Sequence, residues 1–319
     1  MAMSDPQDPS AQPDELFFDR SFAGAPGELV RLSPLVRRMV AGNPGPMTFT
    51  GTCTYVVGSG EVVVIDPGPD CPDHTAALLG ALRGETITTI LVTHTHKDHS
   101  PGARALKAAT GAKIIGCAPH GVARQLSHPG IDAMNDLDYA PDAVLREGDA
   151  LEGKDFSLVC VETPGHAANH LTFALPQENA LFSGDHVMAW STTVVVPPDG
   201  AMRHYMASLA KLLTRQDDVY WPGHGGPVQQ PQSFVRALIQ HRGAREKAIL
   251  ARVAAGDCTI PAIVAKVYKE LSPALANAAG LSVLAHLEDL VERGLVRTEA
   301  GAKIGAIYRP GASARSQAE

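Results

Sequence analysis

The sequence lacks the features that would place the protein in a membrane or in an oxidising compartment. None of its 319 residues belongs to an uninterrupted apolar run of the ~18–20 residues that a membrane-spanning helix requires. Its five cysteines are odd in number and never spaced as Cys-x-x-Cys, which indicates neither a disulfide framework nor a thiolate zinc site. We therefore expect a soluble, cytoplasmic protein with reduced thiols and no membrane contact.

Basic residues are scarce both at the N-terminus and overall. Residues 1–16 contain three prolines and four acids but no lysine or arginine, unlike a signal peptide or a mitochondrial presequence. We expect them to form a disordered tail. A net charge of −7 argues against wholesale capture of nucleic acid, because phosphate binding depends on neutralisation by Lys and Arg. The net charge does not exclude a local basic surface.

Short β-branched runs alternate with helical patterns along the chain as far as residue 235. A hairpin is predicted over 52–66, with its turn at Gly58-Ser59-Gly60. Helices are predicted over 73–83 and 204–213, and another helix should begin with Ser100 as N-cap and Pro101 in its first position. This order favours a layered α/β architecture over a strict βαβ repeat. The further strands expected are 87–93, 113–116, 156–163, 170–175, 180–183 and 219–221.

Histidines and aspartates gather where four of these strands end. The strand before Thr93 runs into a His-Thr-His-Lys-Asp-His segment, in which alternate side chains of an extended chain point to one side. Three later strands each run into a Gly turn that presents one more histidine or aspartate. The candidate metal ligands are His94, His96, Asp98, His99, His166, Asp185 and His224.

Imidazole and carboxylate side chains suit borderline divalent metals, and zinc binds both at ~2.0–2.2 Å. Seven ligands are too many for one tetrahedral ion. Two ions ~3.5–4 Å apart that share a carboxylate would use them all and leave a bridging water as the nucleophile, with its pKa lowered towards ~7. We predict two divalent metal ions, with Zn²⁺ first and Mn²⁺ or Fe²⁺ as alternatives.

The four ligand-bearing segments together resemble the metallo-β-lactamase-like superfamily. They are Thr93-His94-Thr95-His96-Lys97-Asp98-His99, Pro164-Gly165-His166, Ser183-Gly184-Asp185 and Pro222-Gly223-His224. The resemblance implies an αββα sandwich in which His94, His96 and His166 hold one metal. It also implies that Asp98, His99 and His224 hold the other and that Asp185 bridges the two.

Five further segments, spread over most of the chain, are Asn43-Pro44-Gly45-Pro46-Met47-Thr48, Gly51-Thr52-x-Thr54-Tyr55, Thr192-Thr193-Val194, Tyr205-Met206-x-Ser208-Leu209 and His241-Arg242-x-x-Arg245-Glu246. They carry a narrower resemblance, to the lactamase-beta-like protein two group. That group includes an endoribonuclease, so the resemblance implies a phosphodiester such as single-stranded RNA as the leading substrate. Other superfamily members with an aspartate at the bridging position hydrolyse esters, thioesters or lactones, and these small-molecule substrates remain alternatives. A β-lactam is less favoured, since β-lactamases of this fold carry Cys or Ser in place of Asp185.

The C-terminal part predicts three helices, over 233–253, 260–271 and a stretch ending at Gly294, followed by a hairpin. We therefore divide the chain into a tail (1–16), a catalytic domain (17–235) and a winged-helix-like domain (236–319). From His241 onwards there are eleven basic and eight acidic residues. Arg297, Lys303 and Arg309 would contact RNA phosphates, whereas the acids on the third helix would repel them. Nucleic-acid contact, packing and homodimerisation all stay open, as does a winged-helix binding protein with an idle metal site.

Two residues beyond the ligands are candidates for supporting roles. His170 could protonate a leaving oxygen, support a ligand or be an ordinary strand-end histidine. Asp66, at the end of the hairpin, could orient a ligand imidazole by accepting its other N–H. The predicted catalytic residues are Asp98, Asp185 and His170, and loss of either aspartate should abolish turnover.

Overall fold

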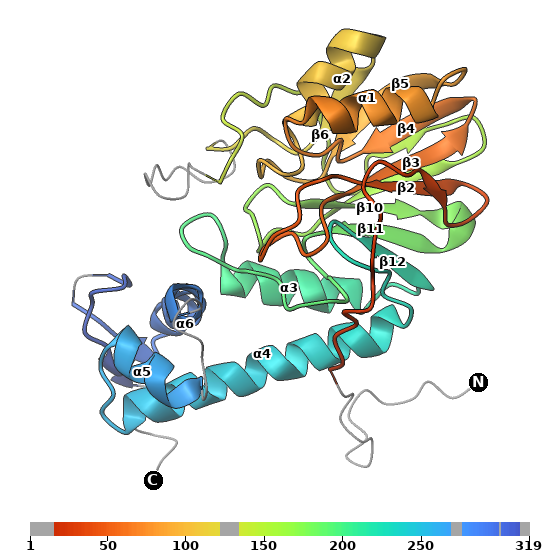
Figure 1. Ribbon diagram of the computed structural model, residues 1–319. Helices are drawn as coiled ribbons and strands as arrows, with labels where there is room; N and C mark the ends of the chain where they lie inside the picture. The colour runs from red at the N-terminus through yellow and green to blue at the C-terminus, as the bar shows by residue number, and fades with distance from the viewer. Residues whose placement is uncertain (1–15, 122–133, 269–275, 300, 313–319) are drawn as a thin grey trace, which may run out of the picture.

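The computed structural model describes residues 16–121, 134–268, 276–299 and 301–312. Two sheets pack face to face, and helices cover their outer faces (Figure 1). This is the predicted αββα sandwich. Residues 1–15, most of the predicted tail, lie outside the described residues.

The first sheet has seven strands that follow one another in chain order. The first four pair antiparallel, and the last three add in parallel. Four strands of the two sheets, β1, β2, β7 and β8, were not predicted from the sequence. The strands of the first sheet are β1 (Val30–Arg31), β2 (Val36–Val40), β3 (Cys53–Ser59), β4 (Glu61–Ile65), β5 (Thr86–Val92), β6 (Lys113–Gly116) and β7 (Ala143–Val144).

The second sheet has the order β12-β11-β10-β9-β8. Its inner face shares one apolar core with the first sheet, where the ring of Tyr55 meets that of Phe182 edge-on at 5.2 Å between centroids. A short 3₁₀ helix, Pro176–Glu178, joins β10 to β11. The strands are β8 (Ala150–Glu152), β9 (Ser157–Glu162), β10 (Leu171–Leu175), β11 (Ala180–Gly184) and β12 (Val219–Pro222).

Helices α1 (Pro72–Ala81) and α2 (Gly102–Thr110) pack on the first sheet, and α3 (Met202–Leu212) packs on the second. The predicted Ser100 cap is wrong, because α2 begins at Gly102 and the Ser100 hydroxyl donates to the buried carboxylate of Asp136 at 2.9 Å. Glycine is required at 102, since a Cβ there would lie 2.5 Å from the carbonyl oxygen of Pro67.

Helix α4 (Pro231–Ala254) runs from the second sheet into the C-terminal part, where α5 (Ile260–Val267) and α6 (Ala276–Glu292) pack on it (Figure 1). The predicted domain boundary after residue 235 falls inside α4. The hairpin is present as β13 (Val296–Arg297) and β14 (Arg309–Pro310). The last residues of the helix predicted over 260–271 lie outside the described residues. No helix in the described part of the chain is both long and apolar enough to span a bilayer.

Candidate metal centre

The sheet topology brings all seven predicted ligands to one edge of the sandwich. Strands β9, β11 and β12 run in the same direction, because β10 pairs antiparallel with both β9 and β11 while β11 and β12 are parallel. Their carboxyl ends therefore share one edge, and the residues that follow them carry His166, Asp185 and His224. The two sheets meet there, since the backbone N–H of Leu171 donates to the carbonyl of Thr93 at 2.8 Å, just before His94.

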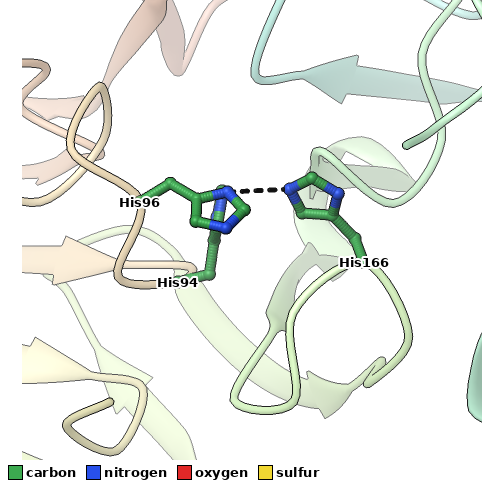
Figure 2. Close-up of side chains that lie close together, drawn as sticks. All are labelled: His94, His96 and His166. Atoms are coloured by element: carbon green, nitrogen blue, oxygen red, sulfur yellow. Dashed lines mark hydrogen bonds between the residues drawn. The ribbon is translucent and has the colours of Figure 1, made fainter. Parts of the chain in front are cut away.

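His94, His96 and His166 form the first ligand cluster (Figure 2). Nδ1 of His96 lies 3.0 Å from Nε2 of His94 and 3.0 Å from Nε2 of His166. All three side chains are at least nine-tenths buried. Three ring nitrogens from three side chains thus converge on one point between β5 and β9.

Asp98, His99 and His224 form the second cluster. Oδ2 of Asp98 lies 3.3 Å from Nε2 of His99 and 3.1 Å from Nε2 of His224. The carboxylate of Asp185 stands between the clusters. Its Oδ1 is 3.4 Å from Nε2 of His99, and its Oδ2 is 3.3 Å from Nε2 of His224 and 3.6 Å from Nε2 of His166. These are the two sets and the bridging position that the resemblance implies.

The geometry fits divalent cations better than a hydrogen-bond network. A neutral imidazole carries one N–H, so the facing ring nitrogens cannot all be satisfied by each other. Tetrahedral ligands at ~2.0–2.1 Å from a zinc ion lie about 3.3 Å apart, close to the separations observed here. Oδ1 of Asp185 is buried and has no hydrogen-bond partner within the described residues. The donor set, imidazole with carboxylate, is that of a divalent metal site.

Contacts behind the ligands orient four of the five imidazoles. Nδ1 of His94 lies 2.9 Å from the Thr93 hydroxyl, and Nδ1 of His99 lies 2.9 Å from Oδ2 of Asp66. Nδ1 of His166 donates to the carbonyl of Val194 at 2.7 Å, and that of His224 lies 3.3 Å from the carbonyl of Gly51. Each contact turns Nε2 towards the centre. Asp66 makes the contact with an imidazole that the sequence predicted for it, whereas the two backbone carbonyls carry no signal in the sequence.

Two histidines of the first cluster and two of the second differ in charge before any metal binds. Burial and the neighbouring histidines lower the pKa of His94 well below its usual range and that of His96 to about 4. Burial also opposes charge on His99 and His224, but nearby carboxylates outweigh it, raising the pKa of His99 well above its usual range and that of His224 to about 9. His94 and His96 are therefore neutral at pH 7, whereas His99 and His224 are ion-paired with Asp98 and Asp185.

His170 is not placed to act as a general acid. It is 1% exposed, its Nδ1 lies 2.9 Å from the Thr163 hydroxyl, and its Nε2 accepts the backbone N–H of Asp185 at 3.1 Å. Burial and the neighbouring His186 keep its pKa well below the usual range. Nε2 therefore carries no proton, and the ring supports the backbone of Asp185 instead.

A pocket of about 330 Å³ opens over the ligands. Its floor is lined by His96, Asp98, His166, Asp185 and His224, and Lys97 is the one lysine or arginine among its lining residues. Trp190 stands at the rim, held by a parallel stack on Phe49 with 4.9 Å between ring centroids. The remaining wall is mostly apolar and includes Pro46, Met47, Met134, Met188 and Val194.

Comparison with known proteins agrees with this geometry. Residues 47–224 match the family described as the Metallo-beta-lactamase superfamily, and residues 259–303 match the Beta-lactamase associated winged helix domain. The chain is 34% identical over 285 residues to a Beta-lactamase-like protein 2 homolog of Drosophila melanogaster, covering 86% of this chain and 94% of that protein.

Two fungal relatives are named as thioesterases. The chain is 32% identical to Thioesterase pkgB of Emericella nidulans over 72% of its own length and 62% of that protein. It is also 32% identical to an Atrochrysone carboxyl ACP thioesterase of Aspergillus fumigatus, over 69% of this chain and 65% of the relative. The chain thus spans less than two thirds of either thioesterase.

Among solved structures, a Beta-lactamase domain protein from Burkholderia ambifaria superposes with a TM-score of 0.74 at 20% identity, covering 90% of this chain and 96% of that one. A metallo-beta-lactamase family protein from Thermus thermophilus superposes with a TM-score of 0.71 at 23% identity, and the match covers 88% of this chain and 100% of that one. At these identities the likeness shows the fold. With the family matches and the ligand clusters, it follows that the chain belongs to the metallo-beta-lactamase superfamily, as a metal-dependent hydrolase with a C-terminal winged-helix domain.

Proposed function

We propose that this protein hydrolyses an acyl ester or thioester with two divalent metal ions held by the seven ligands. The observation that carries the substrate class is the wall of the pocket, where three methionines, a proline and Trp190 surround the ligands. Such a wall suits an apolar acyl chain. Two of the fungal relatives bear the name thioesterase, which agrees with this choice.

Each of the two ligand sets would hold one metal ion. His94, His96 and His166 would hold one ion, Asp98, His99 and His224 the other, and Asp185 would contact both. The ions would lower the pKa of water enough to supply hydroxide at neutral pH and would polarise the substrate carbonyl. We propose Zn²⁺ as the resident metal, because five imidazoles and two carboxylates match its ligand preference.

The residues around the ligands prepare this chemistry. The orientations of four ligand imidazoles are fixed by contacts with Val194, Asp66, Thr93 and Gly51, so little reorganisation is needed when substrate enters. The apolar wall excludes water from the acyl chain. Lys97, which has no ion pair within the described residues, would contact a negative group on the substrate or its carrier.

A phosphodiester, the substrate predicted first from the resemblance, is the second candidate. One lysine and no arginine in the pocket are few for a strand whose every phosphate carries charge. Its support lies on the wing, where Arg297, Lys303 and Arg309 surround a hollow of about 470 Å³. We keep RNA contact and homodimer formation as predictions.

We also propose a cytoplasmic location, because all five cysteines are free thiols, as expected in a reducing compartment. We further propose that α4 contains the boundary between the catalytic domain and the winged-helix domain.

The test compares substrates on protein of measured metal content. Octanoyl-N-acetylcysteamine, an aryl ester, a lactone, nitrocefin and a labelled single-stranded RNA are each incubated with the loaded protein, with chelator-stripped protein and with Asp185→Ala. Metal-dependent thioester or ester hydrolysis with the RNA left intact supports the proposal. Metal-dependent RNA cleavage without acyl hydrolysis overturns the substrate class, and an undiminished rate in Asp185→Ala overturns the role of that residue.

A further inference from the structure

Helix α4 reaches the metal centre through one side chain. Arg242 lies in the middle of this helix, is 5% exposed, and its Nη2 donates to the backbone carbonyl of Thr193. Its guanidinium also lies over the ring of Tyr205, 5.3 Å from the centroid. The donor thus comes from the helix that carries the C-terminal domain, and the acceptor belongs to the loop beside the ligands.

The peptide that Arg242 holds contacts two ligands. The Thr193 hydroxyl donates to the carbonyl of Asp185 at 2.7 Å and lies 2.8 Å from that of His186. The next carbonyl along the chain, that of Val194, accepts the Nδ1–H of His166 at 2.7 Å. A shift of this peptide would move the Asp185 backbone and release the His166 ring together.

The surroundings of Arg242 are unusual for a residue that only packs. Its Nε has no hydrogen-bond partner within the described residues. Glu246 of α4 pairs with Arg293, the residue after α6, whereas Arg242 has no ion pair among the residues that the structure describes. A buried guanidinium without a carboxylate costs stability compared with an apolar side chain of similar size. Packing alone would therefore favour a hydrophobic residue at this position.

We propose that Arg242 is a positioning residue for the metal centre: from the C-terminal helix α4 it fixes the Thr193-Val194 peptide, which in turn holds Asp185 and His166 in ligand geometry. The winged-helix domain is then joined to the metal centre through the helix that supports it. This inference rests on the proposed metal site but not on the identity of the substrate.

The chain supplies a matched control one turn further along α4. Nη1 of Arg245 donates to the carbonyl of Val267 at 3.2 Å, and its guanidinium lies 4.0 Å from the ring centroid of Tyr268. Arg245 thus makes the same two kinds of contact, to a backbone carbonyl and to a tyrosine ring. Its partners belong to α5 and its C-cap, away from the metal ligands.

The experiment measures metal binding rather than activity. Metal-free full-length wild type, Arg242→Leu, Arg242→Lys, Thr193→Val and Arg245→Leu are titrated with Zn²⁺ against a chromophoric chelator. Each is also loaded with Co²⁺, whose visible absorption reports coordination geometry. Urea unfolding of each metal-free variant gives its stability separately. Thr193→Val removes one hydroxyl at nearly constant volume and so leaves the Arg242 contact in place.

We expect Arg242→Leu and Thr193→Val to bind Zn²⁺ about 10–100-fold more weakly and to change the Co²⁺ spectrum, as loss of a ligand's supporting contact does. Arg242→Lys retains a donor and should recover part of the lost Zn²⁺ affinity. The Zn²⁺ affinity of Arg245→Leu should stay within about twofold of wild type, which is less than the smallest loss expected from removal of a supporting contact. Wild-type affinity and spectrum in both Arg242→Leu and Thr193→Val would overturn the inference.

If Arg242→Leu does not fold, the inference is tested with Thr193→Val and Arg242→Lys. Wild-type Zn²⁺ affinity in both of these variants would equally overturn the inference. A wild-type protein that binds no Zn²⁺ would instead refute the proposed function on which the inference rests.

Discussion

Oδ2 of Asp66, the residue after β4, lies 2.9 Å from Nδ1 of His99, in the loop after β5. The same carboxylate accepts the backbone N–H and the hydroxyl of Thr93, each at 2.8 Å. One buried side chain therefore fixes both the start of the ligand segment and one of its imidazoles.

Replacement of Asp66 by Asn tests that support. Asp66 has φ of 50°, and Asn tolerates this left-handed region, so the backbone should survive the change. The amide is a weaker acceptor for the His99 N–H, and we expect metal affinity to fall about 10-fold or more. Chelator competition measures it. Retention of wild-type affinity would mean that Asp66 serves only the fold.

Gly223 leaves no room for a side chain beside the ligands. A Cβ there would lie 2.4 Å from Oδ1 of Asp185 and 2.7 Å from Cε1 of His99. We expect Gly223→Ala to displace one of these side chains and to lower metal content from two ions per chain towards one. Elemental analysis checks this.

Gly243→Ala is the control, because Gly243 lies within α4 and its Cβ would meet nothing within 4 Å. It should keep full metal content and gain up to about 1 kcal/mol of stability from the helical preference of alanine. Full metal content in Gly223→Ala as well would contradict the tight packing around Asp185.

Met47 at the pocket rim should set the preference for longer acyl chains. It is 48% exposed, so Met47→Ser should leave the fold intact while removing apolar contact with the substrate. We expect kcat/KM for an octanoyl thioester to fall roughly fivefold relative to an acetyl thioester, corresponding to about 1 kcal/mol of lost burial. The control Ile304→Ser, at a wing residue 49% exposed, should leave the ratio unchanged. An unchanged ratio in Met47→Ser would remove Met47 from the acyl site.

His286, on α6, should make the protein sensitive to acid. Burial, followed by the charges of Arg242, Arg245, His241 and Arg293, lowers its pKa to about 3 from a usual 6.5. The folded chain keeps this ring neutral, whereas the unfolded chain protonates it below pH 6.5. The free energy of unfolding should therefore fall as the pH drops from 6.5 towards 3.

We expect His286→Leu to remove about 1 kcal/mol of the stability difference between pH 7.5 and pH 5.5 in metal-free protein. Urea unfolding at the two pH values measures this, with His204→Leu on the exposed face of α3 as the control. The same pH dependence of the unfolding free energy in His286→Leu and wild type would refute the role of His286 in acid sensitivity.

The sequence predicted the ligands because their chemistry lies in side chains at fixed spacing. Strands with apolar runs, such as β6, were predicted at their observed ends, whereas β2 was missed. In β2 two buried arginines interrupt the pattern: Arg37 pairs with Glu85, and Arg38 lies over the ring of Phe22. Burial of a charged residue depends on a partner distant in sequence, which a local pattern does not contain.

Contacts made by the backbone escaped prediction for a similar reason. The carbonyls of Val194 and Gly51 support His166 and His224 regardless of the side chains at those positions. Ser100 illustrates the opposite error: a residue suited to a helix cap bonds Asp136 instead, 36 positions away. Arg242 and Thr193 lie in two of the segments quoted for the narrower resemblance, but only the fold brings them together.

The number of metal ions per chain tests the central claim most directly. Elemental analysis of loaded, desalted wild type should give two ions per chain, and Asp98→Ala, which removes a ligand of one cluster, should give one and lose hydrolytic activity. Wild-type protein that holds at most one ion, or that keeps its full hydrolytic rate after the chelator has removed both, would contradict the two-metal centre.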